Sequence, residues 1–425
     1  MNNFLAKISL ALKDQILRKR IGFTVLALVL FRLLATIPVP GVDVGNLAKL
    51  LSSSQLFGFL NIFSGGGLSN LSIVMLGVGP FITASIIIQL LTMMYPKWKN
   101  LMHEEGEAGR LKLSQYSRYL SIPLGIISAI GFLTLLQSQN VLPHISAAAF
   151  AMNVIVITAG STLLMWIGEL VSEFGIGNGV SLIIFAGIVS RLPNDVSQFL
   201  NTPHNPADIP IIIVAIIVGL LVVAGVVYVT EAERSVPVTY AKQVRGNKVY
   251  GGASTYLPLR LNQAGVIPII FALSILLFPR IISAALASWT SHPTIAAYAA
   301  TFSSFFANNW VYGIAYFVLV VLFTYFYTAV TFDPKQISEN LQRSGAFIPG
   351  VRPGTFTMEY LGNIVTRITL VGALFLGIIA VLPLGMQAFT SSQSLAIGGT
   401  ALLIVVSVVL DLLKKIDAQV AMREY

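Results

Sequence analysis

The side chains that most often carry out catalysis or bind metals are sparse in this chain, and none is spaced for either task. The sequence has no cysteine, so it offers neither a thiolate nucleophile nor a disulfide framework. Its four histidines, His103, His144, His204 and His292, fall in expected loops, and no two have the spacing of metal ligands. Neither a GxxxxGKS/T phosphate loop nor an HExxH zinc motif occurs. We therefore predict no catalytic residue, no metal site and no cofactor.

Carboxylates are also missing from the interior of the apolar segments. Glu169 and Glu173 stand at the cytoplasmic end of one apolar segment, and Arg32 lies toward the outer end of another. Proton- or sodium-coupled carriers generally need carboxylates at membrane depth. This absence counts against a secondary transporter with a discontinuous helix. An intramembrane enzyme is disfavoured because the apolar segments hold no histidine and no paired carboxylates.

Two glycine clusters have more than one interpretation. The stretch Gly175–Gly179, GIGNG, superficially resembles a dinucleotide fingerprint, but it precedes an apolar segment and does not open a βαβ unit, so we interpret it as a tight cytoplasmic turn. The run Gly65, Gly66 and Gly67 is followed by no lysine and is no phosphate cradle. We interpret it as a hinge, because glycine backbone bends at little steric cost.

Aliphatic residues are what the apolar segments do offer, in short β-branched runs. Each residue taken alone is better explained by packing or lipid contact, but together they suggest a hydrophobic constriction that blocks ions by dewetting. The residues concerned are Val78, Ile82, Ile183, Ile184, Ile269, Ile270, Ile275 and Ile404.

Composition defines the environment that must position these residues. The chain is 56% hydrophobic and only 10% charged over 425 residues, with a mean hydropathy of +0.82, which is typical of a polytopic helical membrane protein. We predict ten spans, of which the fifth is the shortest and most glycine-rich. They are Gly22–Ile37, Ile73–Leu91, Tyr119–Leu136, Val154–Leu170, Gly177–Leu192, Ile209–Val229, Ala264–Leu286, Trp310–Val330, Ile368–Leu384 and Ser394–Leu413.

The basic residues orient these spans. With both termini cytoplasmic, 22 of the 26 Lys and Arg lie on the cytoplasmic side, leaving Lys49, Arg191 and Arg280 outside and Arg32 within a span. This asymmetry follows the positive-inside rule. Five spans in each half give the halves opposite orientations, as in inverted repeats with a pathway at their interface.

The stretch Ser54–Leu91 is the element around which we expect the chain to be organised. Leu56–Phe63 is apolar for about two helical turns, far short of the roughly 20 residues that cross a bilayer, whereas Ile73–Leu91 is long enough. Broken backbone facing lipid would leave polar groups unpaired. We therefore predict a short, movable apolar segment inside the protein.

Two large cytoplasmic loops and an amphipathic N-terminal helix complete the prediction. In the first loop, two β-rich runs flank Arg245-Gly246-Asn247-Lys248, and Gly-Asn favours a hairpin turn. The second loop is too rich in Pro and Gly around positions 345–354 for a helix. Two solvated basic loops are one explanation. The hairpin pattern, together with Phe347 and Ile348, which we expect to be buried, favours docking surfaces for a cytoplasmic partner.

The expected organisation follows from these segments. We expect a surface helix at 1–20, a first half at 21–192 with the short central segment at about 54–70, and an external hinge loop at 193–208. A second half follows at 209–413 with cytoplasmic loops at 230–263 and 331–367, and then a cytoplasmic tail at 414–425.

Six motifs in order give the chain, over nearly all its length, a specific resemblance to the SecY family, the large subunit of the bacterial protein-conducting Sec channel. They are Ile37-Pro38-Val39-Pro40-Gly41, Asn61-Ile62-Phe63-Ser64-Gly65-Gly66, Ala84-Ser85-Ile86-Ile87-Ile88-Gln89-Leu90-Leu91, Gly175–Gly179, Ala264-Gly265-Val266-Ile267-Pro268, and Gly345–Gly354 with Arg352.

The resemblance implies a fold of ten transmembrane helices in two inverted five-helix halves around an hourglass pore. A plug would include Leu56, Phe57, Phe59, Leu60, Ile62 and Phe63, hinged at Gly65, Gly66 and Gly67. The pore ring would be Val78, Ile82, Ile184, Ile270, Ile275 and Ile404, where Val78 departs from the isoleucine that the family prefers. The second, third, seventh and eighth spans would form a lateral gate.

The resemblance also implies partners and a location. Lys242, Arg245, Lys248, Arg343 and Arg352 would dock the ribosome or the SecA motor ATPase. SecE would clamp the two halves and SecG would lie at the periphery. The protein would lie in the plasma (inner) membrane of a bacterium, pass secretory and membrane-protein substrates, contact lipids, and have no direct nucleic-acid specificity.

The position of the short apolar segment ahead of three glycines yields a first prediction. Deleting Ser54–Ser64 should leave the spans inserted, because moving this segment breaks few obligatory contacts, but should increase ion leak. Membrane extraction and conductance measurements test this, and loss of membrane insertion would contradict it.

Overall fold

The computed structural model of the chain describes residues 14–40, 64, 66–68, 71–95, 98, 106–138, 145–190, 193, 197, 209–241, 243–245, 248–250, 254–276, 301, 308–390 and 393–421. Helices dominate these residues, as predicted. They are α2 (Gln15–Leu34), α5 (Gly79–Met94), α7 (Gly106–Ser138), α8 (Ala147–Phe174), α9 (Gly179–Val189), α11 (Ile209–Glu231), a helix over Ile267–Leu276, α14 (Asn309–Thr331), α15 (Pro334–Arg343), α16 (Thr355–Thr390) and α17 (Gln393–Ala421).

Four stretches among the described residues are long and apolar enough to cross a membrane: Gly106–Gln137, Ala147–Phe174, Trp310–Arg343 and Thr355–Leu382. The helices Gly79–Thr92, Gly179–Val189, Ile216–Glu231 and Ile267–Leu276 are apolar but shorter. The count of ten spans therefore stays a prediction, since several expected spans include residues outside the described ranges.

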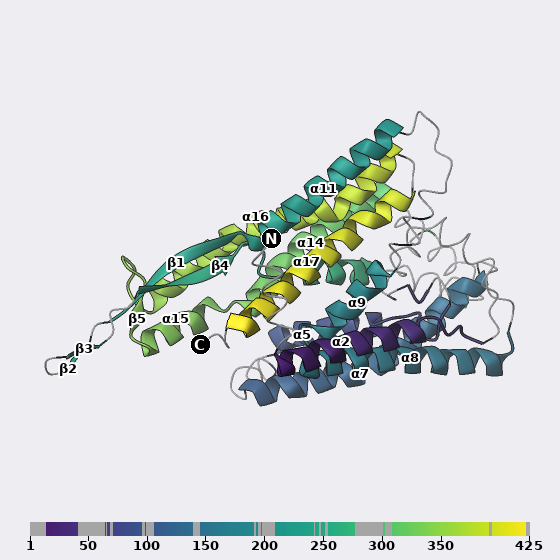
Figure 1. Cartoon of the computed structure of the whole chain (residues 1–425), viewed down its shortest axis with the longest axis horizontal. Coiled ribbons are helices and arrows are strands. Elements are labelled where there is room, and N and C mark those ends of the chain that lie inside the picture. Colours follow the sequence, from purple (N-terminus) through teal and green to yellow (C-terminus); the bar gives the residue numbers. More distant parts are fainter. Residues whose placement is uncertain are drawn as a thin grey trace.

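The helices form two groups that meet along α9 and α17. Before residue 190, α5 packs on α7, α7 on α8, and α2 on α8 and α9. After residue 209, α14 packs on α16, α16 on α17, and α17 on α11. Figure 1 shows α2, α5, α7 and α8 together below α11, α14, α16 and α17, and α17 reaches α9 across the boundary.

The first helix, α2, begins before the predicted span because Asp14 caps it. The Asp14 carboxylate accepts hydrogen bonds from the backbone N–H groups of Ile16 (2.8 Å) and Leu17 (3.5 Å). The helix then runs unbroken to Leu34. Residues 15–20, assigned from sequence to a surface helix, thus belong to the same helix as the first span, whereas residues 1–13 lie outside the described ranges.

The prediction that Ile73–Leu91 forms the second span was wrong for its first six residues, which are not helical. Residues 73–78 form turns, and α5 begins only at Gly79. Gly77 has a φ of +58°, which ends any helical path through it, and Pro80 in the first turn of α5 favours a helix start there. The remaining helix has 16 residues, about 24 Å at 1.5 Å per residue.

The non-helical stretch before α5 lies inside the protein, whereas the short apolar segment Leu56–Phe63, for which the sequence predicted such a position, lies outside the described residues. The Val39 N–H donates to the Leu71 carbonyl (2.8 Å) and the Ile73 N–H to the Ile37 carbonyl (2.9 Å). On the other side, the Ser161 hydroxyl of α8 donates to the Gly77 carbonyl (2.8 Å). These backbone groups thus find partners within the protein, which lipid cannot supply.

The glycines of the Gly175–Gly179 turn are required by close packing. Gly177 has a φ of +92°, and a Cβ on Gly179 would overlap the carbonyl of Gly168 on α8. Asn178 then caps α9 by accepting from the Ser181 N–H (3.2 Å). This confirms a tight turn between the fourth and fifth apolar segments.

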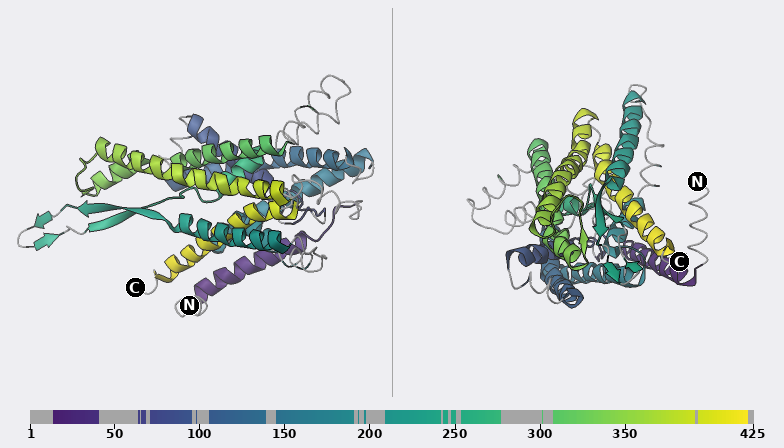
Figure 2. Two further views of the ribbon diagram at one scale, coloured as in Figure 1. Left: turned by 90° about the horizontal axis from the view of Figure 1, so that it is seen from above. Right: turned by 90° about the vertical axis from the view of Figure 1, so that its left-hand side faces the viewer.

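The first of the two large loops, residues 230–263, is the predicted hairpin, extended into a sheet. Strands β1 (Glu233–Tyr240) and β4 (Ser254–Arg260) pair antiparallel, and beyond them β2 (Gln243–Arg245) pairs with β3 (Lys248–Tyr250). Strand β5 (Ala346–Phe347) adds to β1, which gives the order β4-β1-β5. Figure 2 shows this ribbon projecting beyond the helices.

The second large loop, residues 331–367, contains more helix than expected. Residues 346–354 form β5 and turns, as predicted, but α15 precedes them and α16 begins at Thr355. Ile348 is buried and packs with Val236, Val238 and Leu361 between the sheet and α16. Phe347, expected to be buried, is exposed at 37%, because successive strand residues face opposite sides of a sheet.

Both ends of the described chain lie at one end of the molecule. Leu17 of α2 belongs to an apolar cluster with Ile416 and Val420 of α17. Nearby, the Lys414 Nζ pairs with the Glu231 Oε1 at the end of α11 (2.9 Å). Figure 2 shows the start of α2 and the end of α17 close together, which is consistent with an even number of spans.

The packing of α8 against the non-helical stretch yields a prediction. A Cβ at Gly160 would overlap the Ile73 carbonyl, so Gly160→Ala should destabilise the fold by roughly 1–3 kcal/mol, as overpacking does. The midpoint of thermal unfolding in detergent measures this. Gly219→Ala on α11 is the control, because nothing lies within 4 Å of a Cβ there. Equal midpoints for the two variants would show that this contact does not constrain the fold.

Candidate pore constriction and docking surface

The six residues predicted to form a ring come from four separate elements, and the structure gathers them in one apolar cluster. Val78 caps α5, Ile82 lies in α5, Ile184 in α9, Ile270 and Ile275 in the helix over Ile267–Leu276, and Ile404 in α17. Five are buried, with exposed fractions from 0% to 6%, and Ile275 is partly buried against the same cluster. The elements meet because α9 lies between the two helix groups.

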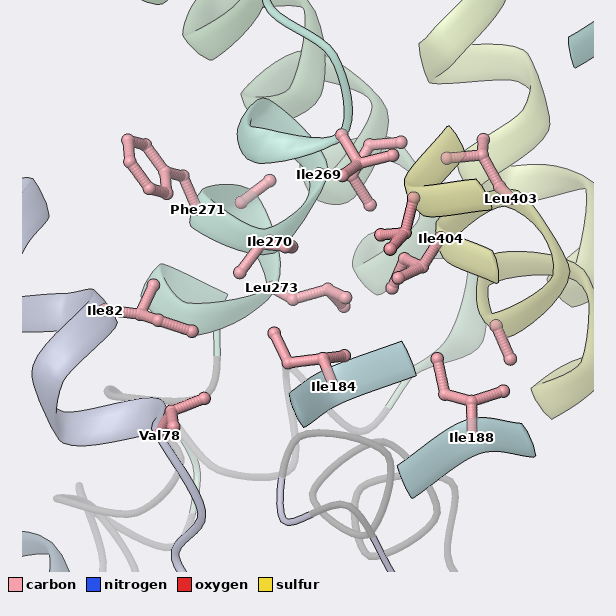
Figure 3. Close-up of a cluster of buried hydrophobic side chains, with 14 of the residues drawn as sticks. Val78, Ile82, Ile184, Ile188, Ile269, Ile270, Phe271, Leu273, Leu403 and Ile404 are labelled. Carbon is pink, nitrogen blue, oxygen red and sulfur yellow. The ribbon is translucent and has the colours of Figure 1, made fainter. Parts of the chain in front are cut away.

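The close-up in Figure 3 shows how these side chains converge. Ile82, Ile184 and Ile404 point toward a shared space between their helices, and Leu273 points into it as well. No charged residue occurs in α5, in α9 or in the helix over Ile267–Leu276, and Asp411 is the first in α17. The side chains that these described elements contribute are therefore uncharged.

Among the residues of this cluster that were not predicted are Ile188 and Leu273. Ile188 lies one turn after Ile184 on α9, and Leu273 lies three residues after Ile270; both are buried in the cluster. Residues three or four apart share a helix face, so this spacing was the signal that could have identified them. Ile275, by contrast, stands about 140° around the helix from Ile270 at roughly 100° per residue, which explains why it is only partly buried.

The described part of the glycine hinge is a buried, hydrogen-bonded turn. Gly66 has a φ of +83°, and a Cβ on Gly67 would come within 2.7 Å of the Ser72 Oγ. Ser64 accepts from the Leu68 N–H through its hydroxyl (3.0 Å) and from the Gly67 N–H through its carbonyl (3.2 Å). Any movement here must break these bonds.

The six expected plug residues and Gly65 lie outside the described residues. Because Ser64 accepts both hydrogen bonds of the turn, a deletion of the plug should end at residue 63.

A cleft of about 770 Å³ separates the two helix groups on one side. Its walls are α5 and α7 on one side and α14 and α16 on the other, with further residues from the start of α15. The lining mixes Phe81, Ile88 and Tyr327 with hydroxyl-bearing residues such as Ser117 and Thr328. The predicted seventh span, Ala264–Leu286, was expected to form part of a lateral gate, but it contributes none of the described residues that line this cleft.

The predicted docking residues have different surroundings. Arg352 and Arg343 are both exposed, and Arg343 makes only a loose pair with Glu339 (3.8 Å) on its own helix, a kind worth little in water. Arg245 and Lys248 stand opposite each other on β2 and β3, at the far tip of the ribbon in Figure 1. Lys242 lies outside the described residues.

One ion pair ties the first group of helices together near the expected cytoplasmic face. The Arg118 Nε of α7 lies 2.6 Å from the Glu169 Oε1 of α8. The glutamate is mostly buried and the arginine partly exposed, so the pair fixes two neighbouring helices. Within the part of the chain that the structure describes, no group of three or more His, Asp or Glu is placed to hold a metal ion.

Comparison with known proteins gives the same picture as the geometry. The family model for SecY matches residues 72–413. The protein translocase subunit SecY of Corynebacterium glutamicum is 42% identical, covering 98% of each chain, and that of Halalkalibacterium halodurans is 41% identical, covering 96% of each. A solved structure of a protein conducting channel aligns over 96% of this chain and 93% of its own, with a TM-score of 0.65 and 19% identity. Sec61 from a canine ribosome-channel complex aligns with a TM-score of 0.59 and 19% identity, over 96% of this chain and 93% of its own.

The fold and the similar proteins define a multi-pass helical membrane protein, with an apolar cluster where its two helix groups meet. Within that class, the chain belongs to the SecY family.

The convergence of aliphatic side chains yields a prediction that separates a neck from ordinary packing. Ile82→Asn combined with Ile184→Asn should give an inserted protein with raised resting ion conductance, because polar groups let water into a dewetted constriction. The paired Leu variants should stay sealed. Conductance of the purified complex in planar bilayers is the measurement.

The control is the same change to asparagine at Val25 and Val29 of α2. These residues are 54% and 52% exposed on the outside of the protein, so polarity there should change stability and not leak. Equal leak from both pairs would mean that the pore is assigned to the wrong helices.

Proposed function

We propose that this chain forms the protein-conducting channel of a bacterial Sec translocase. It passes unfolded secretory polypeptides across the plasma membrane and releases signal sequences and transmembrane segments sideways into lipid. The single observation that carries the proposal is the convergence of Val78, Ile82, Ile184, Ile270 and Ile404 from four elements into one uncharged cluster.

An aliphatic neck suits a substrate of arbitrary sequence. Val and Ile side chains make no hydrogen bonds or ion pairs, so a passing chain meets no strong attachment site. A narrow apolar passage also resists water and ions when it is empty. The named relatives are translocase subunits, and one neighbouring SecY structure is described as having a plug domain that maintains a membrane seal. We assign the same sealing role to the residues around 54–70.

Sideways release needs an opening between the helix groups, and the cleft supports a lateral gate there. Its walls come from α5 and α7 in the first group and α14 and α16 in the second. Separating these walls opens the interior toward lipid without breaking a helix. The mixed lining accepts an apolar segment while its hydroxyls tolerate water.

The energy for transport comes from partners in this proposal, since the channel itself catalyses no reaction. The SecA motor ATPase or the ribosome binds the basic cytoplasmic surface formed by the ribbon and by Arg343 and Arg352. SecE clamps the two halves and SecG lies peripherally. Both termini are cytoplasmic, as the distribution of Lys and Arg favours.

A crosslinking experiment tests the channel role directly. A photoreactive group is placed at Ile82 or Ile184, and a secretory precursor arrested during export should crosslink to either position. The same group at Val25 on the exposed face of α2 serves as the control. Crosslinks at Val25 but at neither ring position would rule out the proposed path.

The exposed Arg352 yields a prediction about docking. Its guanidinium suits bidentate pairing with a partner carboxylate, which Lys does not reproduce. Arg352→Glu should cripple export while expression and membrane insertion remain near normal. Precursor translocation into vesicles is measured beside membrane abundance of the channel, and unimpaired transport would refute the role of Arg352.

A further inference from the structure

The turn that carries Arg352 is fixed by two buried hydroxyl groups from different helices. The Thr357 Oγ1 of α16 donates to the backbone carbonyl of Arg352 itself (2.9 Å). The Ser338 Oγ of α15 donates to the carbonyl of Gly354, two residues further on (2.7 Å). Thr357 and Ser338 are only 2% and 3% exposed, so the two donor hydroxyls lie inside the fold, while the bonds that they make are part-buried.

The same turn is anchored on both sides of the arginine. Before it, Ile348 is buried against the sheet, and the Val351 N–H donates to the Ile348 carbonyl (3.0 Å). After it, Gly354 has a φ of +95°, and its carbonyl also accepts from the Met358 N–H (3.1 Å) at the start of α16. The backbone of Arg352 is therefore held while its side chain stands in solvent.

Nothing within the described residues uses the guanidinium that this turn presents. No ion pair joins Arg352 to a carboxylate of the described chain, in contrast to Arg118 and Arg343. A charged group on a rigid support loses less conformational entropy on binding than one on a flexible loop. A fixed support thus favours pairing with a group on another molecule.

We propose that Thr357 and Ser338 are positioning residues for docking, whose hydroxyls hold Arg352 where it pairs with a carboxylate on a cytoplasmic protein partner. The inference rests on the proposed docking role of Arg352 and adds the residues that make this docking specific. The alternative is that both hydroxyls only satisfy buried carbonyls and stabilise the fold.

A double-mutant cycle separates these possibilities. Purified complex in vesicles is titrated with the SecA motor ATPase as the probe, and the dissociation constant is measured. Thr357→Val keeps the branched shape but removes the donor, and should raise the dissociation constant about fivefold, the effect of one lost hydrogen bond. Ser338→Ala should act in the same direction, and Thr357→Ser, which keeps the hydroxyl, should bind like the unmodified protein.

The decisive comparison is made in the background of Arg352→Ala. If Thr357 acts through Arg352, Thr357→Val has no further effect on the dissociation constant once the guanidinium is absent. Thr324→Val is the matched control, because Thr324 is 3% exposed and its hydroxyl donates to the Val320 carbonyl of its own helix (2.7 Å). This control should leave binding unchanged.

The outcomes bear on the two proposals separately. Weakening by Thr357→Val that disappears in the Arg352→Ala background supports positioning. Weakening that persists there, or no weakening at all, overturns it while the role of Arg352 stands. If Arg352→Ala itself binds the motor normally, the docking role of Arg352 fails and the positioning proposal fails with it.

Discussion

The structure depends on a single constraint, which is that non-helical backbone at membrane depth must find its hydrogen-bond partners inside the protein. The stretch Leu71–Val78 meets this constraint through the carbonyl and N–H groups of residues 37–39 and through the hydroxyl of Ser161 on α8. Gly160 lets α8 approach closely enough for this contact. The late start of α5 follows from it, and so does the position of Val78 and Ile82 at the centre of the molecule.

In the function proposed here, the apolar neck and the docking surface would divide the work of transport between them. The neck is aliphatic and offers a passing chain no site to bind, whereas the ribbon and the turn at Arg352 carry exposed positive charge. The long helices α14 and α16 pack on each other and line the cleft, and α16 begins directly after the turn that carries Arg352. With such a division, one protein would bind its translocating substrate weakly in the neck and bind its cytoplasmic partners specifically through charged side chains.

The helices and the hairpin could be predicted from the sequence, whereas the start of α5, two cluster residues and the exposure of Phe347 could not. The physical reasons for these outcomes differ. Apolar runs and turn residues predict helices and the hairpin because these depend on local chemistry. The beginning of α5 was missed because hydropathy reports burial and not which backbone groups are paired, although Gly77 and Pro80 were local signals. Ile188 and Leu273 were missed because the ring was chosen by family likeness and not by helical spacing. The exposed side of Phe347 depends on its pairing with β1, which lies over a hundred residues away in sequence and leaves no local trace.

The hydroxyls that line the cleft have one more consequence. Thr92, Ser117 and Thr328 each donate their proton to a carbonyl one turn earlier in their own helix. These protons are already engaged, so a segment that enters the cleft gains few directional contacts from them. Its residence there is then governed by how well its surface dissolves in hydrocarbon compared with water. These three hydroxyls would therefore let the cleft sort segments by their free energy of transfer from water to hydrocarbon.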